Sequence, residues 1–384
     1  MKAGVVFLAV ACLLVSFAGP ASAQDGKPTK PLDPVTAILT AFKTYDIVAL
    51  GEGNHGNEQG AAFRQALVRD PRFAATVNDI VIESGAGQHQ AVADRYVNGE
   101  DVPEGELRKI WQDTTAPQAV WDSPIYGDLL RAVRQMNAKL PKGRRIRVLL
   151  GDTPIDWAKI ESGEAQWRRT DEFTVETIQR EVLGKKRKAL VVYGDLHFLR
   201  IGMPAFAPTA PKEPPSMVAL LERAGVKAFS IWTYTGQGRP DDQDLDKLQA
   251  DVASWKVPSL AMVRGTTLGL THFAFYFPAG LGTFSMRQPD GSILRISAPA
   301  GPGLMQEQFD AVLYLGPTKS ITYSRPSAAL CADPDYVAMR VRRIAVMAPP
   351  PPQAAPTASA KAQRSVSDDM IDAFKARCLA QAQR

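Results

Sequence analysis

The hydrophobic positions of the chain form short, nearly continuous apolar runs that alternate with segments of helical periodicity. Such runs are typical of strands in a parallel sheet, because helices cover both faces of the sheet and every side chain is buried. The predicted strands are 46–50, 79–83, 145–150, 188–193, 226–234, 259–263 and 309–315. The pattern therefore predicts an α/β fold with a mostly parallel central sheet flanked by helices.

Helical patterns fill the intervals between these runs. One helix is predicted to begin at Asp33-Pro34 and to extend to about residue 43, because aspartate is a favoured N-cap and proline is favoured at the first helical position. The other predicted helices are 58–68, 125–140, 171–183 and 217–224. They supply the crossovers that a parallel sheet requires.

Two segments depart from this simple alternation. The connection 84–144 is far longer than one crossover helix needs, and it is rich in aromatic residues. We expect a helical cap (about 85–141), inserted after the second strand, to fold over the strand ends, although core packing would account for its aromatic residues equally well. The short segments in 273–296, with a turn at Pro289-Asp290-Gly291, predict a small added hairpin.

Residues 1–23 are predicted to be a secretory signal peptide. Lys2 gives a positive start, residues 5–17 are apolar, and Ala21-Ser22-Ala23 matches a small-residue cleavage site. The apolar stretch is too short to span a membrane. We expect cleavage after Ala23, a periplasmic or secreted protein, and no membrane insertion of the mature chain.

The rest of the chain divides into three parts. The main α/β domain is predicted to occupy 24–347, followed by a linker at 348–362 that is rich in proline and alanine. Residues 363–384 predict a C-terminal helix, whose first turn suits the acidic Asp368 and Asp369.

Two cysteines, Cys331 and Cys378, remain after signal cleavage. An even number of cysteines in an oxidising compartment suggests a disulfide, and two unpaired thiols are the alternative. A disulfide would hold the C-terminal helix against the main domain.

The charge of the chain gives no indication of a nucleic-acid partner. The formal net charge of +5 falls to +4 when the single charge of Lys2 is removed with the signal peptide. The densest basic clusters, 144–147 and 185–188, directly precede or begin apolar strands, and solvated strand ends explain them better than a nucleic-acid surface. We expect a small-molecule or peptide substrate.

Polar residues gather where the first four predicted strands end. They are Glu52 and His55 after the first strand, Glu83 at the end of the second, Asp152 after the third, and Asp195 and His197 after the fourth. Because the carboxyl ends of parallel strands lie along one edge of the sheet, these groups are expected to converge. Asp152 and Asp195 are candidates for substrate binding. Any one of these residues taken alone would more often be a helix cap or a satisfied polar group.

The first strand leads into the turn Gly51-Glu52-Gly53-Asn54-His55-Gly56. Its glycines allow a sharp turn that displays the side chains between them. The turn also matches the G-x-G-x-x-G pattern of dinucleotide-binding folds, with Glu83 at the end of the next strand. We favour an active-site turn, because Glu52 would place negative charge against a pyrophosphate and nicotinamide nucleotides are scarce outside the cytoplasm.

The common nucleophile motifs are missing. The sequence contains no G-x-S-x-G elbow, no H-E-x-x-H motif and no mature cysteine near a histidine. Ser84 follows a strand and precedes a glycine, but it lacks the second glycine of an elbow. His89 and His272 are predicted to be core or surface residues rather than ligands.

Several residues at these strand ends resemble the motifs of a known family. The order Leu50-Gly51-Glu52-x-x-His55-Gly56, then Arg64 on the next helix, then Ile80-Val81-Ile82-Glu83 is similar to the erythromycin esterase-like family, within a wider group that includes the Tiki proteases and the ChaN-type haem-binding lipoproteins. Gly194-Asp195-Leu196-His197 resembles the second G-x-x-H element of that group. Residues 309–314 resemble a late strand of the esterase-like members.

The resemblance implies a hydrolase that acts on an ester or amide bond. His55 would be the general base that activates water, with Glu52 and Glu83 holding charge beside it. His197 would assist as an acid or an oxyanion partner, and Arg64 would bind a carboxylate or steady one of the acids. A neutral histidine titrates near neutral pH, and a nearby carboxylate fixes its tautomer.

Two alternatives stay open. Glu52, His55, Glu83 and His197 together offer a ligand set for a divalent metal, which would give a metal-dependent hydrolase or peptidase of the Tiki type. A protein of the ChaN type would instead bind haem without catalysis. The favoured interpretation requires no cofactor.

Overall fold

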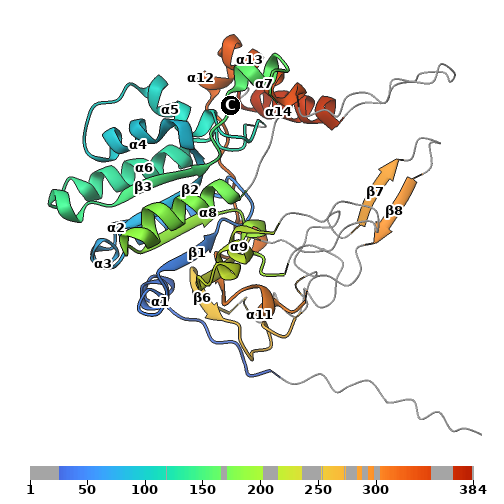
Figure 1. Ribbon diagram of the computed structural model, residues 1–384. Helices are drawn as coiled ribbons and strands as arrows, with labels where there is room; N and C mark the ends of the chain where they lie inside the picture. The colour runs from blue at the N-terminus through green and yellow to red at the C-terminus, as the bar shows by residue number, and fades with distance from the viewer. Residues whose placement is uncertain are drawn as a thin grey trace, which may run out of the picture.

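The computed structural model describes residues 26–117, 119–165, 171–201, 215–235, 252, 254–271, 273, 283–287, 293–297, 303–346 and 366–382 (Figure 1). The predicted signal peptide, the predicted linker, His272 and the turn at Pro289-Asp290-Gly291 lie outside these residues. Among the described helices, none is long and apolar enough to cross a membrane.

A seven-stranded sheet forms the centre of the described chain, with the strand order β3-β2-β4-β1-β5-β9-β6. The strands are β1 (Ile47–Gly51), β2 (Asp79–Ala86), β3 (Arg147–Asp152), β4 (Ala189–Tyr193), β5 (Ala228–Tyr234), β6 (Ser259–Met262) and β9 (Ala311–Tyr314). Neighbours pair in parallel, except that β6 runs antiparallel to β9 at one edge. The predicted mostly parallel α/β sheet is confirmed.

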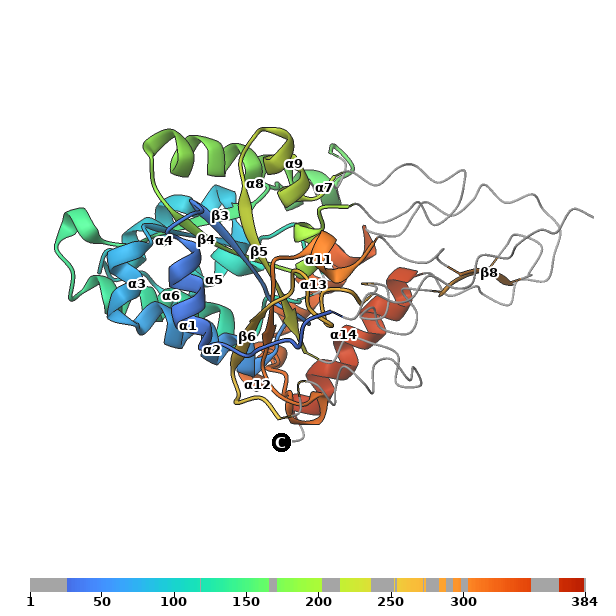
Figure 2. The same cartoon turned by 90° about the horizontal axis from the view of Figure 1, so that it is seen from below.

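Helices cover both faces of this sheet (Figure 2). On one face lie α1 (Pro34–Ala41), α2 (Glu58–Arg69), α3 (Pro71–Thr76), α4 (Gln90–Val97), α5 (Glu104–Gln112) and α6 (Pro124–Asn137). On the other lie α8 (Glu172–Thr177), which continues as a π-helix (Ile178–Val182), α9 (Met217–Arg223) and α11 (Met305–Gln308). The predicted N-cap of the first helix is present, since Asp33 accepts a hydrogen bond from Thr36 N at 2.8 Å.

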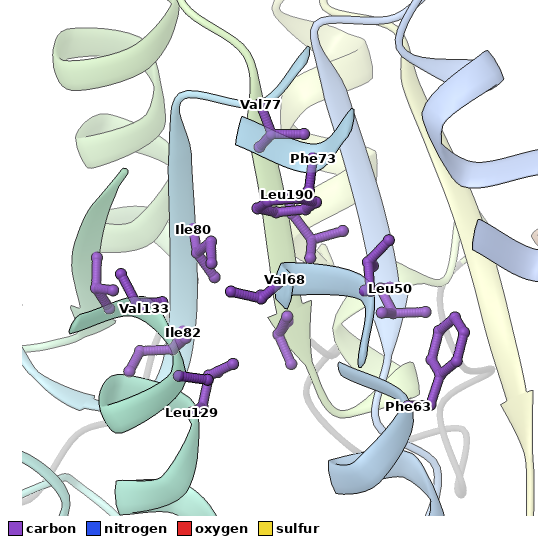
Figure 3. Packing of buried hydrophobic residues seen from close by; sticks show 14 of the residues in the cluster. Leu50, Phe63, Val68, Phe73, Val77, Ile80, Ile82, Leu129, Val133 and Leu190 are labelled. Atoms are coloured by element: carbon purple, nitrogen blue, oxygen red, sulfur yellow. The ribbon is translucent and has the colours of Figure 1, made fainter. Parts of the chain in front are cut away.

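The alternation of strand side chains explains the two cores. In β1, Val48 and Leu50 pack with the first group of helices, whereas Ile47 and Ala49 pack with the second group. Successive side chains of a strand point to opposite faces, so a strand that is covered on both faces must be apolar throughout. Figure 3 shows the first core, where Phe63 and Val68 of α2 pack on the same face as Leu50.

The insertion after β2 is confirmed as helical. The expected cap over the strand ends is wrong for these helices, because α4, α5 and α6 bury their apolar sides on a face of the sheet. Thr115 and Trp121, in the connection between α5 and α6, do reach the strand ends. The predicted hairpin is also confirmed, as the antiparallel pair β7 (Thr283–Arg287) and β8 (Ile293–Ser297).

Three C-terminal helices form a separate small core against the insertion. They are α12 (Ala328–Cys331), α13 (Pro334–Ala345) and α14 (Val366–Ala382), and α7 (Trp157–Glu161) lies beside α13. The predicted disulfide between Cys331 and Cys378 is confirmed, and it ties α14 to α12.

Candidate active site

The turn after β1 is held in one conformation by its own residues. Gly53 and Gly56 have φ values of +71° and +84°, in the left-handed region that favours glycine. Asn57 caps α2 by accepting a hydrogen bond from Gly60 N, and its amide donates to the carbonyls of Glu52 and Asn54, each at 2.7 Å. The turn that carries Glu52 and His55 is therefore braced by hydrogen bonds of its own residues.

Glu52, His55 and Arg64 form one connected group. Glu52 Oε2 lies 2.7 Å from His55 Nδ1, and Glu52 Oε1 accepts a hydrogen bond from Arg64 Nη2 at 2.8 Å. The side chains of Glu52 and Arg64 are 4% and 6% exposed, whereas that of His55 is 30% exposed. A buried ion pair thus supports a histidine that solvent can reach.

The charge on Glu52 is stabilised despite its burial. Burial acts to raise the pKa of this carboxyl, but the Arg64 cation and the hydrogen bond with His55 outweigh it and hold the pKa below its usual value. Tyr126 adds a hydrogen bond to Glu52, and its hydroxyl also accepts one from Gly56 N at 2.8 Å. The phenol pKa of Tyr126 is raised well above its usual value by burial and by the Glu52 charge, so the phenol keeps its proton.

A second histidine–carboxylate group follows the neighbouring strands. Glu83, in β2, accepts a hydrogen bond from Gly194 N on Oε2 at 2.7 Å, and its Oε1 lies 3.2 Å from His197 Nε2. His197 Nδ1 lies 2.6 Å from Asp171 Oδ1, and Asp171 Oδ2 accepts a hydrogen bond from Met217 N at the start of α9. His197 is therefore oriented by a carboxylate on each side of its ring.

The two groups meet at Gly194. A Cβ atom placed on Gly194 would lie 3.0 Å from His55 Cε1, 3.2 Å from His55 Nε2 and 3.5 Å from Glu83 Oε2. His55 and Glu83 thus face the same small space, which glycine leaves open. This is the convergence that the strand-end positions predict for His55, Glu83 and His197.

Asp152 and Asp195 are placed differently from the other predicted site residues. Asp152 accepts hydrogen bonds from Thr115 N and Oγ1 at 2.5 and 2.6 Å, and burial raises its pKa to about 6. Asp195 accepts a hydrogen bond from Thr233 N at 3.0 Å, and burial raises its pKa to about 7. Both residues are buried, and each accepts a hydrogen bond from a backbone N–H of another segment.

Three residues that surround the histidines are not in the predicted site. Asp171 lies in the loop before α8, and Trp121 and Tyr126 lie in the inserted segment. Their aromatic or acidic character is visible in the sequence, but no motif marks them. His89, by contrast, is engaged outside the site, where its Nε2 lies 3.0 Å from Asp113 Oδ2.

The four residues considered as metal ligands do not fit a divalent ion as they stand. Glu52 presents its oxygens to His55 and Arg64, and the ring nitrogens of His197 face Asp171 and Glu83. Within the described part of the chain, no three or more His, Cys, Asp or Glu side chains are arranged to hold a metal ion.

The fold and site define an α/β protein with two histidine–carboxylate groups at the carboxyl edge of a parallel sheet. No protein-family model and no curated protein matches the chain. Among solved structures, it is similar to a Bacillus cereus protein (16% identity, TM-score 0.46, covering 78% of this chain and 96% of that one). It is also similar to an erythromycin esterase mutant in its open conformation (11%, 0.47, 75% and 94%) and to ChaN of Campylobacter jejuni with cofacial haem (14%, 0.35, 54% and 88%).

The erythromycin esterase-like and ChaN-type proteins that the sequence resembles are thus among these structural matches. At such low identities and TM-scores, the likeness concerns the overall architecture and assigns neither activity nor ligand.

Proposed function

We propose that this protein is an exported hydrolase that cleaves an ester or amide bond by histidine-assisted activation of water. The observation that supports the proposal is the Glu52–His55 pair, in which a buried carboxylate lies 2.7 Å from Nδ1 of an imidazole that is 30% exposed. In the tautomer whose Nδ1–H donates a hydrogen bond to Glu52, Nε2 carries no proton, and its lone pair can act as a general base.

The reaction follows from this tautomer. Nε2 of His55 takes a proton from water as the water oxygen bonds to the substrate carbonyl carbon, and the carbonyl π electrons move to oxygen. The intermediate then collapses, the bond to the leaving group breaks, and the His55 imidazolium returns its proton to that group. Glu52, kept charged by Arg64, stabilises the imidazolium during both steps.

Glu83 and His197 suit a supporting role. Glu83 faces the same space as His55 and adds negative charge there, which favours the imidazolium. His197, whose two ring nitrogens face Glu83 and Asp171, would hold Glu83 in position beside His55, and it would act as an acid or oxyanion partner only after releasing Glu83. The proposed substrate is a small molecule or a peptide, and the proposed mechanism needs no cofactor.

Substitution of His55 tests this proposal directly. On a panel of esters, His55→Ala should lower turnover by at least about 10²-fold, because general-base catalysis contributes about 10²- to 10⁴-fold. The melting temperature should change little, since the ring is partly exposed. His89→Ala is the matched control and should keep most activity. Wild-type turnover by His55→Ala would overturn the assignment.

Two further measurements separate the alternatives. Activity that survives dialysis against a chelator supports the metal-free route, whereas a loss that added metal restores supports a metal-dependent hydrolase. A Soret band after haem addition, with no ester turnover, would favour a haem-binding protein of the ChaN type.

Export has its own test. N-terminal sequencing of protein from the periplasm or medium should begin at Gln24. A cell-associated chain that retains residues 1–23 would contradict export without affecting the catalytic proposal.

A further inference from the structure

Trp121 links the candidate active site to a distant part of the chain. Its ring meets His55 edge-on, with centroids 4.5 Å apart and planes at 73°, and it meets Tyr126 in the same way at 5.0 Å. Glu52 fixes one nitrogen of the His55 ring, so the indole contact on the ring limits how far the imidazole can rotate. Trp121 is 2% exposed, so its contacts are with protein.

The next residue, Asp122, faces the C-terminal helices. Asp122 accepts hydrogen bonds from Arg340 Nη2 on Oδ1 at 2.6 Å and from Arg340 Nε on Oδ2 at 2.7 Å, and Tyr336 donates its hydroxyl proton to Oδ2. The side chains of Asp122 and Arg340 are 0% and 1% exposed. A bidentate pair fixes orientation as well as distance, because two parallel hydrogen bonds resist rotation.

The same short segment is anchored a second time. Ala119 has a φ of +60°, a conformation that a non-glycine residue keeps only when its surroundings enforce it. It packs in the small core formed with Leu330, Tyr336 and Phe374. The segment 119–122 is therefore held on both sides of Trp121 by α12, α13 and α14, of which the disulfide joins α12 to α14.

We propose that the Asp122–Arg340 pair is a positioning clamp, which uses the C-terminal helices to hold Trp121 against His55 and so fixes the imidazole for proton transfer. The inference rests on the proposed function and extends it to a region far along the sequence. Trp121, Asp122 and Arg340 act through His55 and are positioning residues.

The energetics favour a geometric role for the pair. Removing two charges from water costs much of what their attraction returns, so an apolar replacement of similar volume often gives equal stability. What such a replacement lacks is the fixed angle of a bidentate contact. The pair is thus better suited to orient Trp121 than to stabilise the fold.

The clamp can be tested with matched variants. Trp121→Leu and the double variant Asp122→Leu/Arg340→Met should each lower kcat on a cleaved ester about 10-fold, because small misplacements of a reacting group are costly, with KM within about twofold. Trp121→Phe should restore most of the rate. Arg342→Gln is the control, since Arg342 lies on the same helix and pairs with Glu161 at the surface.

A spectroscopic measurement makes the test independent of turnover. The indole ring current shifts the His55 Cε1 proton resonance, which is assigned by its disappearance in His55→Ala. This resonance should move in Trp121→Leu and in the double variant, and stay in place in Arg342→Gln. If the double variant does not fold, Arg340→Lys keeps the charge but loses the bidentate contact, and should move it too.

The outcomes distinguish the two proposals. Folded clamp variants with an unmoved resonance, or with unchanged kcat, would overturn the clamp. If wild-type protein cleaves neither esters nor amides, the proposed function fails, and the resonance alone decides whether the C-terminal helices position His55.

Discussion

The two ends of strand β2 carry buried carboxylates in opposite situations. At the amino end, Asp79 is fully buried and receives paired hydrogen bonds from both Arg147 and Arg187, at 2.7 to 3.2 Å. Near the carboxyl end, Glu83 is equally sheltered but meets the Gly194 N–H and the His197 ring. Asp79 is paired with two arginines that are permanently charged. Glu83 is instead beside a backbone N–H, which donates a hydrogen bond, and a histidine, which can gain or lose a proton.

The buried carboxylates at the two positions of β2 thus serve different purposes, one in stabilising the sheet and the other in the proposed chemistry. Arginine keeps its charge at all relevant pH values, so the amino-end group can only hold strands β2, β3 and β4 together. Histidine changes charge near neutral pH, so the carboxyl-end group can take part in proton transfer. Mutations at the two ends should therefore affect different properties.

Glu83→Gln should change activity far more than stability. The amide keeps the size of the side chain but removes the charge that favours a His55 imidazolium, so turnover should fall about 10²-fold. The melting temperature should move by only a few degrees. Ester kinetics and thermal unfolding on the same sample give both values, and a purely thermal effect would place Glu83 with the structural carboxylates.

Asp79→Asn should show the reverse pattern. Removing the charge takes the shared carboxylate from Arg147 and Arg187, of which Arg147 keeps Glu181 as a second partner, and breaking a buried ion pair typically costs about 3–5 kcal/mol of the free energy of unfolding. Turnover per folded molecule should stay near the wild-type value. Urea denaturation measures the loss, and a large fall in kcat at full folding would contradict the separation that we describe.

Asp195→Asn should change the pH dependence of stability. Burial raises the pKa of Asp195 from 3.8 to about 7. Between these pH values the Asp195 carboxyl is protonated in the folded protein and ionised in the unfolded chain. The contribution of this bound proton to the free energy of unfolding is complete below pH 3.8 and is lost as the pH rises to about 7. The free energy of unfolding should therefore be lower at pH 8 than at pH 5 by up to about 3 kcal/mol.

Asparagine cannot release this proton and can still accept the hydrogen bond from Thr233 N. Denaturation midpoints at pH 5 and pH 8 should therefore lie closer together in Asp195→Asn than in wild type. An unchanged difference would mean that Asp195 is not the group that titrates.

Gly194→Ala should give the smallest effect. Gly194 has an ordinary φ of −57°, so alanine causes no backbone strain, but its Cβ would lie 3.0 Å from His55 Cε1. A shift of a few tenths of an ångström in the imidazole should lower kcat about 3-fold, with stability changed by less than about 1 kcal/mol. Gly105→Ala, where a Cβ meets open space, is the control for alanine substitution and should leave kcat unchanged.

Much of the fold could be predicted from the sequence because it depends on local and periodic signals. The apolar runs mark all seven strands of the sheet, and the Asp33-Pro34 pair marks the start of α1. The strand-end positions of His55, Glu83 and His197 also follow from the pattern, because a parallel sheet brings such ends to one edge. These features depend on residue type and on position along one strand or helix.

Other features required the tertiary structure. Asp171 and Trp121 do not belong to any recognisable motif. Asp171, before α8, contacts His197, and Trp121, in the insertion, contacts His55, only because the fold brings these distant segments together. The sequence does not distinguish Asp152 and Asp195 from Glu83, although Asp152 accepts hydrogen bonds from the backbone and hydroxyl of Thr115, and Asp195 accepts one from the backbone N–H of Thr233.

By itself, the sequence determined the α/β class, the helical insertion, the two cysteines available for a disulfide and the edge of the sheet at which polar groups gather. The tertiary structure decided which of those groups face a common space, that Arg64 holds Glu52, and that Arg340 reaches Asp122 from far along the chain. The physical reason is the distance along the chain over which each interaction acts. Periodicity and turn chemistry act over a few neighbouring residues, whereas ion pairs and ring contacts depend on how distant segments pack.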